Sequence, residues 1–308
     1  MLRFTLRRSA QMIVVVLGVV TLVFFILRFA TGDPARLMHP PGEQDEIVQL
    51  TRERLGTDQP LMVQYGDYLV GLAQGDLGTS FHGGQPVMEE VLNTLPNTAA
   101  LAAVTIVASS TLALVLGIAA ALRPNGLFDR AVLVYVSLAL ATPSFWLAIV
   151  LVLFFAVRLA WFPAVDMEGP RSFVLPVATL VVALTPVLIR TIRQSFLDTL
   201  GDDHVRAARA RGISERRVIL VHGLKVASLP LVTLVGLQAG LILAGAYVVE
   251  FIFNWPGIGK LTLDAVAGRN FPVIQGGVLV AAVAFVLVNF VVDLVYAALD
   301  PRIRLGMR

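Results

Sequence analysis

Six long runs without a charged residue constrain the fold of this chain more than any other feature. They are residues 10–27, 98–122, 131–157, 172–189, 226–249 and 271–292. As a helix at 1.5 Å per residue, the first run is roughly 27 Å long, close to the thickness of a bilayer's hydrocarbon core. With 57% of its residues hydrophobic and only 15% charged, the chain has too much apolar surface for one soluble core. We therefore expect an all-α polytopic membrane protein with six transmembrane helices.

The placement of the basic residues predicts how these helices are oriented. Six spans put both termini on one side, and most of the Arg and Lys residues lie in segments that share that side. Basic residues favour the cytoplasmic side, so the chain is predicted to be N-in and C-in. A signal peptide explains the N-terminus less well, because no small-residue cleavage site follows the first run and five more runs come later.

The most basic stretch separates the fourth run from the fifth, in residues 198–228, here called the central loop. Apolar Val205 and Ala208 alternate with arginines, which predicts a short helix that ends at Gly212. Ser214 is then expected to cap a second amphipathic helix. A loop that only fixes orientation and touches anionic lipid is the alternative. Two short helices joined at a glycine would give a partner protein a shape to grip.

The segment between the first two runs, residues 31–95, is the largest part predicted to lie outside the spans. Its acidic residues outnumber its basic residues ten to three. Helices are expected over residues 46–55, from Pro60 onward, and over residues 86–95. A bare loop of this length would be unusual. An extracytoplasmic helical insertion that serves as a docking surface or gate is therefore favoured over a small cap packed on the bundle.

Several of these motifs resemble those of bacterial ATP-binding cassette importer permeases. Ala207, Ala208, Gly212 and Leu229-Pro230 are similar to the "EAA" cytoplasmic loop of that family, although Arg206 stands where the motif's name has Glu. Further segments resemble the B-type subunits of dipeptide, oligopeptide and nickel permeases. These segments are Gly32-Asp33-Pro34-Ala35, Gly56-Thr57-Asp58-Gln59-Pro60-Leu61, Gly75-Asp76-Leu77-Gly78, Thr142-Pro143-Ser144-Phe145-Trp146 and Glu250 to Gly259.

The resemblance implies a permease subunit that imports small peptides across the bacterial cytoplasmic membrane. It implies as partners a second, C-type permease, two ATPase subunits, an extracytoplasmic binding protein and membrane lipid, with no nucleic acid. ATP and magnesium would be bound by the ATPase subunits, encoded by one gene or two, so this chain is expected to be no enzyme and to hold no cofactor or metal. Nickel or haem import by the same type of transporter is the alternative.

The resemblance also implies a domain organisation and site roles. The expected domains are residues 1–30, 31–95, 96–301 and a cytoplasmic tail at 302–308. Coupling to the ATPase is assigned to Arg206, Ala207, Ala208, Arg209, Arg211 and Gly212. Candidates for the pathway or an external gate are Pro143, Trp146, Glu250, Phe253 and Trp255. Candidates for docking the binding protein are Asp58, Tyr65, Tyr68 and Asp76.

Other chemistries find little support in the sequence. Gly257 to Lys260 resembles the end of a phosphate-binding loop, but Asn254 and Leu261 occupy positions that require Gly and Ser or Thr. The four histidines show no metal-ligand spacing, and there is no cysteine. An ion-driven secondary transporter would be expected to show internal repeats or acidic residues within its spans, and the sequence shows neither pattern. A membrane protease would need a Ser/His pair, which the sequence does not indicate either. The importer permease is therefore the favoured hypothesis.

Overall fold

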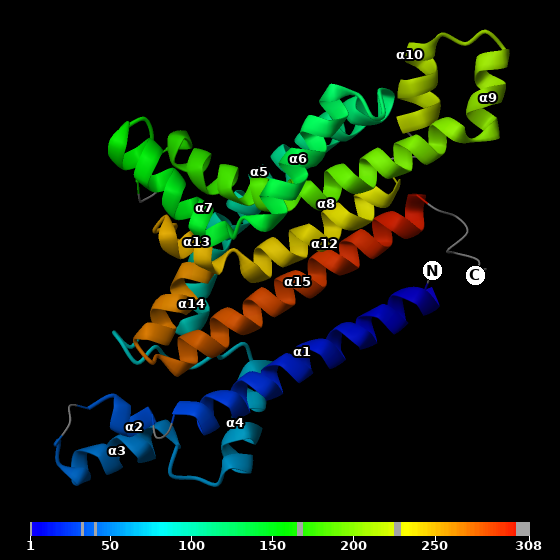
Figure 1. Ribbon diagram of the computed structural model, residues 1–308. Coiled ribbons are helices and arrows are strands. Elements are labelled where there is room, and N and C mark those ends of the chain that lie inside the picture. Colours follow the sequence, from blue (N-terminus) through cyan, green and yellow to red (C-terminus); the bar gives the residue numbers. More distant parts are fainter. Residues whose placement is uncertain (1, 32–33, 40–41, 165–168, 225–228, 300–308) are drawn as a thin grey trace. The chain divides into compact units, whose positions relative to one another are not determined.

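The structure is a computed structural model in which two compact units are described (Figure 1). It describes residues 2–31, 34–39, 42–164, 169–224 and 229–299. One unit comprises Met1–Thr98 and Pro256–Val286, and the other comprises Ala99–Trp255 and Leu287–Arg308. The regular structure in these ranges is helical, apart from one isolated bridge between Thr79 and Pro86. The all-α expectation is confirmed for this part of the chain.

The first unit consists of helices from both ends of the chain. They are α1 (Leu2–Thr31), α2 (Pro34–Leu37), α3 (Asp45–Leu55), α4 (Leu61–Ala73), α14 (Ile258–Ala267) and the first parts of α5 (Val87–Leu122) and α15 (Phe271–Leu299). The helices predicted over 46–55 and from Pro60 are confirmed as α3 and α4. Gly56 ends α3 at φ 65°, where its N–H bonds the carbonyls of Arg52 and Glu53.

Aromatic side chains pack α4 against α1 in this unit. Phe24 is fully buried, and its ring stacks on Tyr68 with the centroids 5.5 Å apart. The hydroxyl groups of Tyr65 and Thr21 share a 2.7 Å hydrogen bond. The larger core joins Val20, Leu77, Val87, Val91, Ile258, Phe271, Ile274 and Leu279. The residues following the first apolar run are therefore packed helices rather than a bare loop.

The prediction of a separate short helix over 86–95 is wrong. Residues from Val87 onward are helical, but α5 runs without a break through Pro96 to Leu122. A proline removes only its own N–H from the helical ladder, and the helix continues where packing on both sides holds it. The helix expected outside the membrane is thus the beginning of the second long helix.

The second unit contains the remaining helices. They are α6 (Leu127–Ala141), α7 (Ser144–Leu151), a π-helical turn (Val152–Arg158), a 3₁₀ turn (Pro170–Phe173), α8 (Val174–Gly201), α9 (Asp203–Ala210), α10 (Glu215–Arg217), a second π-helical turn (Val218–Gly223), α12 (Leu229–Gly245), α13 (Tyr247–Ile252) and the rest of α5 and α15. Their apolar residues form clusters between α5, α6 and α8 and between α7, α8 and α13.

Four helical stretches are long and apolar enough to cross a membrane. They are Arg8–Phe29, Val87–Leu122, Pro170–Gly201 and Phe271–Val292, which match the first, second, fourth and sixth runs. The third run corresponds to α6 and the helix after it, which meet at an angle of 99°. The fifth run includes α12, whose 17 residues span about 26 Å. The part described thus contains four candidate spans, or five if the bent pair is one span, and six remains a prediction.

Proline shapes these helices in two ways. The third run breaks at Thr142 and Pro143, and the Thr142 hydroxyl donates to the carbonyl of Leu138 at 2.8 Å. Pro186 instead lies inside α8 without ending it. There the hydroxyl of Thr185 donates to the carbonyl of Val181 at 2.8 Å. Both threonine hydroxyls bond to the carbonyl four residues before their own position, so neither reaches the carbonyl that the proline itself leaves without an N–H partner.

Candidate functional site

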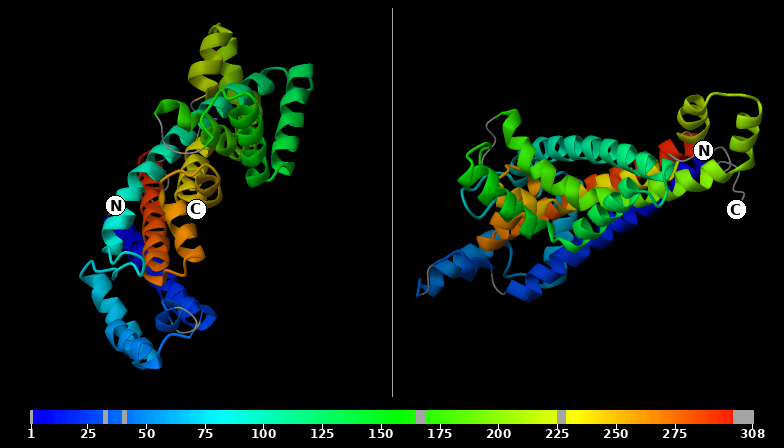
Figure 2. Two further views of the ribbon diagram at one scale, coloured as in Figure 1. Left: turned by 90° about the vertical axis from the view of Figure 1, so that its left-hand side faces the viewer. Right: turned by 45° about the horizontal axis from the view of Figure 1, so that its top comes forward.

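The central loop forms a pair of short helices at the end of α8. Figures 1 and 2 show α9 and α10 projecting beyond that end. The chain turns between them at Gly212, which has φ 75°, as the sequence predicts. Ser214 occupies the predicted cap position, but its side chain makes no capping hydrogen bond. Its carbonyl instead accepts the N–H groups of Arg217 and Val218, so the cap is formed by the backbone.

A small apolar core holds the two helices of the central loop together. Val205 of α9 and Val218, which directly follows α10, are fully buried in one apolar cluster. Ala208 belongs to the same cluster and is 6% exposed. Leu200 and Ile213 pack at the edge of this cluster. Ala208, one of the six coupling candidates, therefore supports the loop from inside. Arg206, Ala207, Arg209, Arg211 and Gly212 are exposed.

An ion pair closes the turn of the central loop. The guanidinium of Arg209 donates two hydrogen bonds to the carboxylate of Glu215, from Nε at 3.1 Å and from an NH₂ group at 2.7 Å. These bonds hold the pKa of Glu215 below its usual range. Because both side chains are well exposed, water screens the pair, and it adds little to stability. Its two hydrogen bonds link the last turn of α9 to the first residue of α10.

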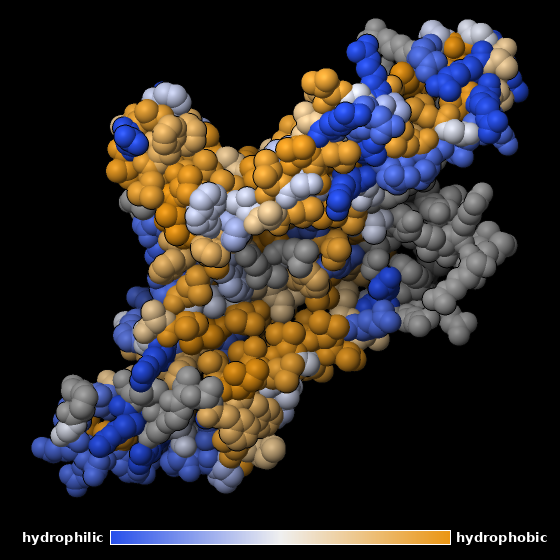
Figure 3. Space-filling view, in the orientation of Figure 1, coloured by the Kyte–Doolittle hydropathy of each residue, from blue (hydrophilic) through white to orange (hydrophobic). Residues whose placement is uncertain are grey.

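The outer face of the central loop is basic. Arg206 reaches the carbonyl of Gly201 and the carboxylate of Asp203, both at 3.1 Å, while Arg211 and Arg217 are exposed. In Figure 3, hydrophilic residues gather over α9 and α10, whereas hydrophobic residues dominate the visible surface over α6. The loop thus offers exposed guanidinium groups around a small apolar core, which suits an acidic surface on a partner protein.

A buried ion pair that the sequence analysis missed secures the helix from which the loop extends. Arg193 of α8 donates to both oxygens of Asp129 on α6, at 2.6 and 2.8 Å. Asp129 is 1% exposed, and it also accepts the backbone N–H of Asn125 at 2.8 Å. The two charged residues are 64 positions apart, so no local pattern indicated the pair. It fixes α8 against α6 before the chain enters the central loop.

The five pathway or gate candidates have different surroundings. Glu250, Phe253 and Trp255 are buried, and the Trp255 ring lies 4.6 Å from that of Phe173. Trp255 donates its backbone N–H to the carbonyl of Glu250 at 2.8 Å. Pro143 and Trp146 are exposed, and the exposed fraction of Trp146 is 53%. Helix α7, which begins directly after Pro143, packs on α13. The candidates therefore belong to one unit but share no single surface.

The four docking candidates also differ in exposure. Tyr65 and Tyr68 are half-buried against α1, whereas Asp58 and Asp76 are exposed. Burial is the main cause that raises the pKa of Tyr68 to about 12, so its phenol stays protonated at neutral pH. Tyr68 and Asp76 both line a cavity of about 400 Å³. Of the four docking candidates, the structure thus places these two in the lining of one cavity, and docking itself stays a prediction.

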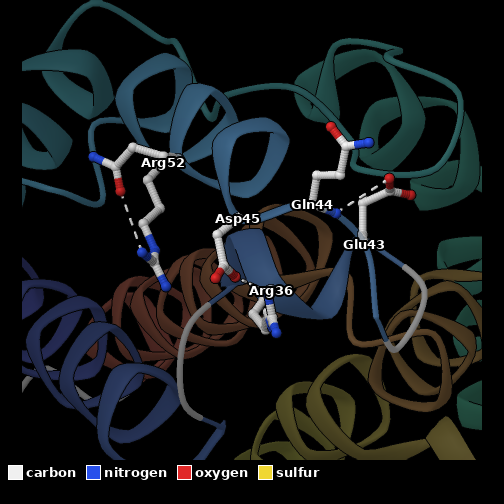
Figure 4. A network of polar contacts seen from close by, with 6 residues as sticks. Arg36, Glu43, Gln44, Asp45 and Arg52 are labelled. Atoms are coloured by element: carbon white, nitrogen blue, oxygen red, sulfur yellow. Dashed lines mark hydrogen bonds and ion pairs between the residues drawn. The ribbon is translucent and has the colours of Figure 1, made fainter.

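Helix α3 in the same segment carries exposed polar contacts. Figure 4 shows Arg36 of α2 paired with Asp45, with nitrogen and oxygen 2.8 Å apart, and Arg52 reaching a neighbouring side chain. That neighbour is Gln49, whose oxygen lies 3.2 Å from Arg52. Neither Arg36 nor Arg52 lines the cavity, whereas Arg54 does. Two arginines two residues apart on one helix thus have different surroundings.

These features describe a helical chain with several apolar helices long enough to cross a membrane and a central loop whose exposed face is basic. Residues 113–305 match the family described as "Binding-protein-dependent transport system inner membrane component", and residues 1–102 match its N-terminal counterpart. The chain is 41% identical over 304 residues to the "Glutathione transport system permease protein GsiC" of Salmonella typhimurium (strain LT2), with 99% of each chain covered. Identity to the protein of that name in Escherichia coli (strain K12) is 39%, with the same coverage.

The chain therefore belongs to this family: it is an ATP-binding cassette importer permease of the peptide type. It is a multi-pass protein of the bacterial inner membrane. The resemblance of the central loop and of the Glu250 segment to this family had indicated the same assignment from the sequence.

Proposed function

We propose that this chain is the B-type permease subunit of an importer that moves small peptides into the cell. In this proposal a second, homologous permease pairs with it, two ATPase subunits bind ATP and magnesium, and an extracytoplasmic binding protein delivers the solute. The observation that carries the proposal is the central loop, in which an apolar core and an Arg209–Glu215 pair support an exposed basic face. That face is the proposed ATPase contact, centred on Arg206, Ala207, Arg211 and Gly212.

The buried ion pair suggests how movement of the loop would reach the spans. When the ATPase subunits close, they would displace α9 and α10. Because α8 continues directly into the loop and Arg193 ties it to Asp129 on α6, the displacement would move α6 and α8 together. Packed helices move as rigid units rather than deforming, so these spans would tilt between outward and inward openings.

For the solute, we propose glutathione as the first compound to test. The relatives named above are glutathione transport permeases, and glutathione is a tripeptide with both an amino group and carboxylates. Dipeptides and longer peptides belong to the same chemical class. Nickel and haem, carried by other members of the wider group, are the alternatives, and an ion-driven carrier is the alternative of another class.

The proposal also gives roles to the other candidate residues. Docking of the binding protein is proposed for exposed Asp58 and Asp76, and a role in the solute pathway for the region of Glu250. Replacing Asp58 by Lys should weaken association of the binding protein and leave ATPase association intact. Equal association of the binding protein in the variant and in the wild type would remove Asp58 from the docking surface.

Co-purification tests the proposed complex. The chain is tagged at its C-terminus, extracted from native membranes in mild detergent, and the accompanying proteins are identified. A sister permease and two ATPase subunits are expected, and added binding protein should join them. Reconstituted vesicles should then take up labelled glutathione with ATP but not with a non-hydrolysable analogue. A chain that purifies alone and whose uptake follows a proton or sodium gradient would contradict the proposal.

A further inference from the structure

The cavity in the unit formed by Met1–Thr98 and Pro256–Val286 has the size and lining of a small-molecule site. Its volume of about 400 Å³ falls in the range of roughly 300–1,000 Å³ that such sites occupy. Helices α1, α3, α4 and α15 and the turn after α4 contribute to its walls. The groups in its lining that can recognise charge or donate hydrogen bonds are Arg28, Arg54, Gln64, Asp67, Tyr68, Asp76 and Gln275.

Gln275 supplies an unused hydrogen-bond donor in this lining. The residue is 7% exposed, and its Nε2 atom has no hydrogen-bond partner in the part of the chain that the structure describes. Buried polar atoms are almost always paired, because an unpaired one loses its bonds to water without replacing them. The Nε2 atom is itself buried, so the Gln275 side chain would turn toward the cavity to meet an acceptor that a ligand brings.

Two arginines line the same cavity without an acidic partner among the described residues. The Nε atom of Arg28 donates to the amide oxygen of Gln64 at 2.9 Å, and its guanidinium carbon lies 4.2 Å from the centre of the Phe24 ring. These contacts hold the guanidinium plane in one place. Arg54 is exposed and forms no ion pair there. A guanidinium group of fixed orientation favours a carboxylate, which it can bind through two parallel hydrogen bonds.

Two aspartates give the cavity a negative group as well. Asp67 and Asp76 are exposed, and within the described ranges neither forms an ion pair with Arg28 or Arg54. Asp76 accepts the backbone N–H of Gly78 at 2.8 Å, which fixes the carboxylate at the turn after α4. A lining that carries both signs of charge is complementary to a molecule that itself carries both.

We propose that this cavity binds a short zwitterionic peptide, with its carboxylate against Arg28, Arg54 and Gln275 and its ammonium group against Asp67 or Asp76. The inference rests on the proposed peptide import and gives this chain a solute site of its own. An acidic side chain of a partner protein is a poorer occupant, because it would leave the aspartates uncompensated and would fill only part of the volume.

Direct binding of a model peptide tests the proposal. The full-length chain, with the subunits that accompany it but without binding protein, is placed in lipid nanodiscs and titrated with trialanine. The amide of trialanine, which lacks the carboxylate, and N-acetyl-trialanine, which lacks the ammonium group, are titrated in parallel. Each loss of one charge-assisted contact should weaken binding by about tenfold or more.

Variants locate the site. Arg54→Gln and Gln275→Leu should each weaken trialanine binding by about tenfold. Arg52→Gln is the matched control, because Arg52 lies on the same helix as Arg54 and contacts Gln49 instead of the cavity. Arg54 is exposed, so its replacement leaves packing intact even if the change at buried Gln275 disturbs folding.

Three results would overturn the inference. The first is equal affinity for trialanine and for its amide. The second is unchanged affinity for trialanine in Arg54→Gln. The third is an Arg54→Gln variant that loses association with the binding protein and keeps its affinity for trialanine. The third result would assign the cavity to a partner protein. Uptake separates this inference from the proposed function: ATP-driven peptide uptake without trialanine binding would reject only the cavity site. Trialanine binding that loses affinity in Arg54→Gln, without ATP-driven uptake, would support the cavity and reject peptide import.

Discussion

Arginines point outward in the central loop and inward in the cavity of the other unit. In the loop, Arg206 and Arg211 surround a small apolar core formed by Val205, Ala208 and Val218. In the cavity, Arg28 and Arg54 face a shared space of about 400 Å³ together with a buried amide. Both regions thus contain exposed or partly exposed arginines beside buried apolar side chains. Arginines that face outward form a surface for a partner protein, whereas arginines that line a cavity form a site for a small molecule.

The difference arises from what each region has to bury. The loop buries valine and alanine on the inner faces of α9 and α10, so its long charged side chains are left outside. In the other unit, Phe24, Tyr65 and Tyr68 pack α4 against α1, and the space left beside these rings is lined by polar groups. Each prediction below alters one region and uses the other as its reference.

The largest effect is expected at the Arg193–Asp129 ion pair, which holds α8 near the point where the central loop begins. Arg193→Ala removes the partner of Asp129 and leaves a buried carboxylate unpaired. Breaking a buried pair in this way costs roughly 3–5 kcal/mol, and we expect the lower end because Arg193 is 17% exposed. Thermal unfolding of the purified complex in detergent measures the loss. Peptide binding in the cavity should persist below the lowered melting temperature.

Arg190→Ala provides the control for that loss. Arg190 is exposed on the same helix, so its removal should change the melting temperature little. The double variant Asp129→Asn/Arg193→Met should recover much of the lost stability, since no charge is then left buried. Equal melting temperatures for Arg193→Ala and Arg190→Ala would show that the buried pair does not hold α8 against α6.

A smaller effect is expected at the turn of the central loop. Gly212 has φ 75°, and a Cβ atom there would meet nothing within 4 Å, so Gly212→Val acts through backbone strain alone. Strain of this kind costs about 1–3 kcal/mol. Uptake should fall while membrane insertion and trialanine binding are retained. Gly212→Asn should keep most of the uptake, because Asn tolerates a positive φ.

Gly201→Ala is the matched control for the Gly212→Val experiment. A Cβ atom at Gly201 also meets nothing within 4 Å, but its backbone is not in the left-handed region. Uptake should therefore be close to that of the wild type. Wild-type uptake in Gly212→Val would remove the turn of the loop from the coupling mechanism.

One substitution in each region, measured by both assays, tests whether the location of an arginine determines its effect. Arg211→Gln should weaken association of the ATPase subunits several-fold and leave trialanine affinity unchanged, because Arg211 is exposed on the loop. Arg54→Gln should weaken trialanine binding and leave association of the ATPase subunits unchanged. Pull-down of the ATPase subunits and peptide titration of the same two preparations give both readouts. If either variant changes both readouts, charge rather than location determines the effect.

The smallest expected effect depends on pH. Hydrogen bonds from Arg209 lower the pKa of Glu215 from its usual 4.5 in the folded loop. The pair is therefore intact at neutral pH, and its contribution is lost as the pH falls below about 4.5 and through the lowered folded-state pKa. Hydrogen exchange at the loop, corrected for the intrinsic rate, should separate the wild type from Glu215→Gln at pH 7. The two should converge in acid, whereas a constant difference would contradict the pairing.

The sequence predicted best those features that local patterns determine. Helices α3 and α4 begin within one residue of their expected starts, and Gly56 and Pro60 lie directly after α3 and directly before α4. The turn at Gly212 followed from the same reasoning. The family assignment, made from a combination of motifs, is confirmed. These features depend on residues a few positions apart, for which backbone preferences are decisive.

Features that depend on distant residues were not predictable in the same way. Nothing near Asp129 or Arg193 in the sequence indicates that the two meet. The cavity unites Arg28, Arg54 and Gln275 from three separate helices, and charge counting had treated the arginines only as topology signals. The continuous helix through Pro96 depends on packing, which overrode the local expectation of a break. The roles of the coupling, gate and docking residues remain predictions.

Cross-linking from the central loop tests whether this loop contacts the ATPase. The chain has no cysteine, so Arg211→Cys and Arg54→Cys each place one reactive thiol in an otherwise unreactive subunit. Native membranes carrying either variant are labelled with a maleimide–benzophenone reagent, whose maleimide bonds to the introduced thiol and whose benzophenone inserts into a neighbouring C–H bond on irradiation, and the products are identified by mass spectrometry. We predict a cross-link to an ATPase subunit from position 211 and none from position 54. Absence of the ATPase from the products at position 211, with the complex intact, would contradict the assignment of the loop as the coupling surface.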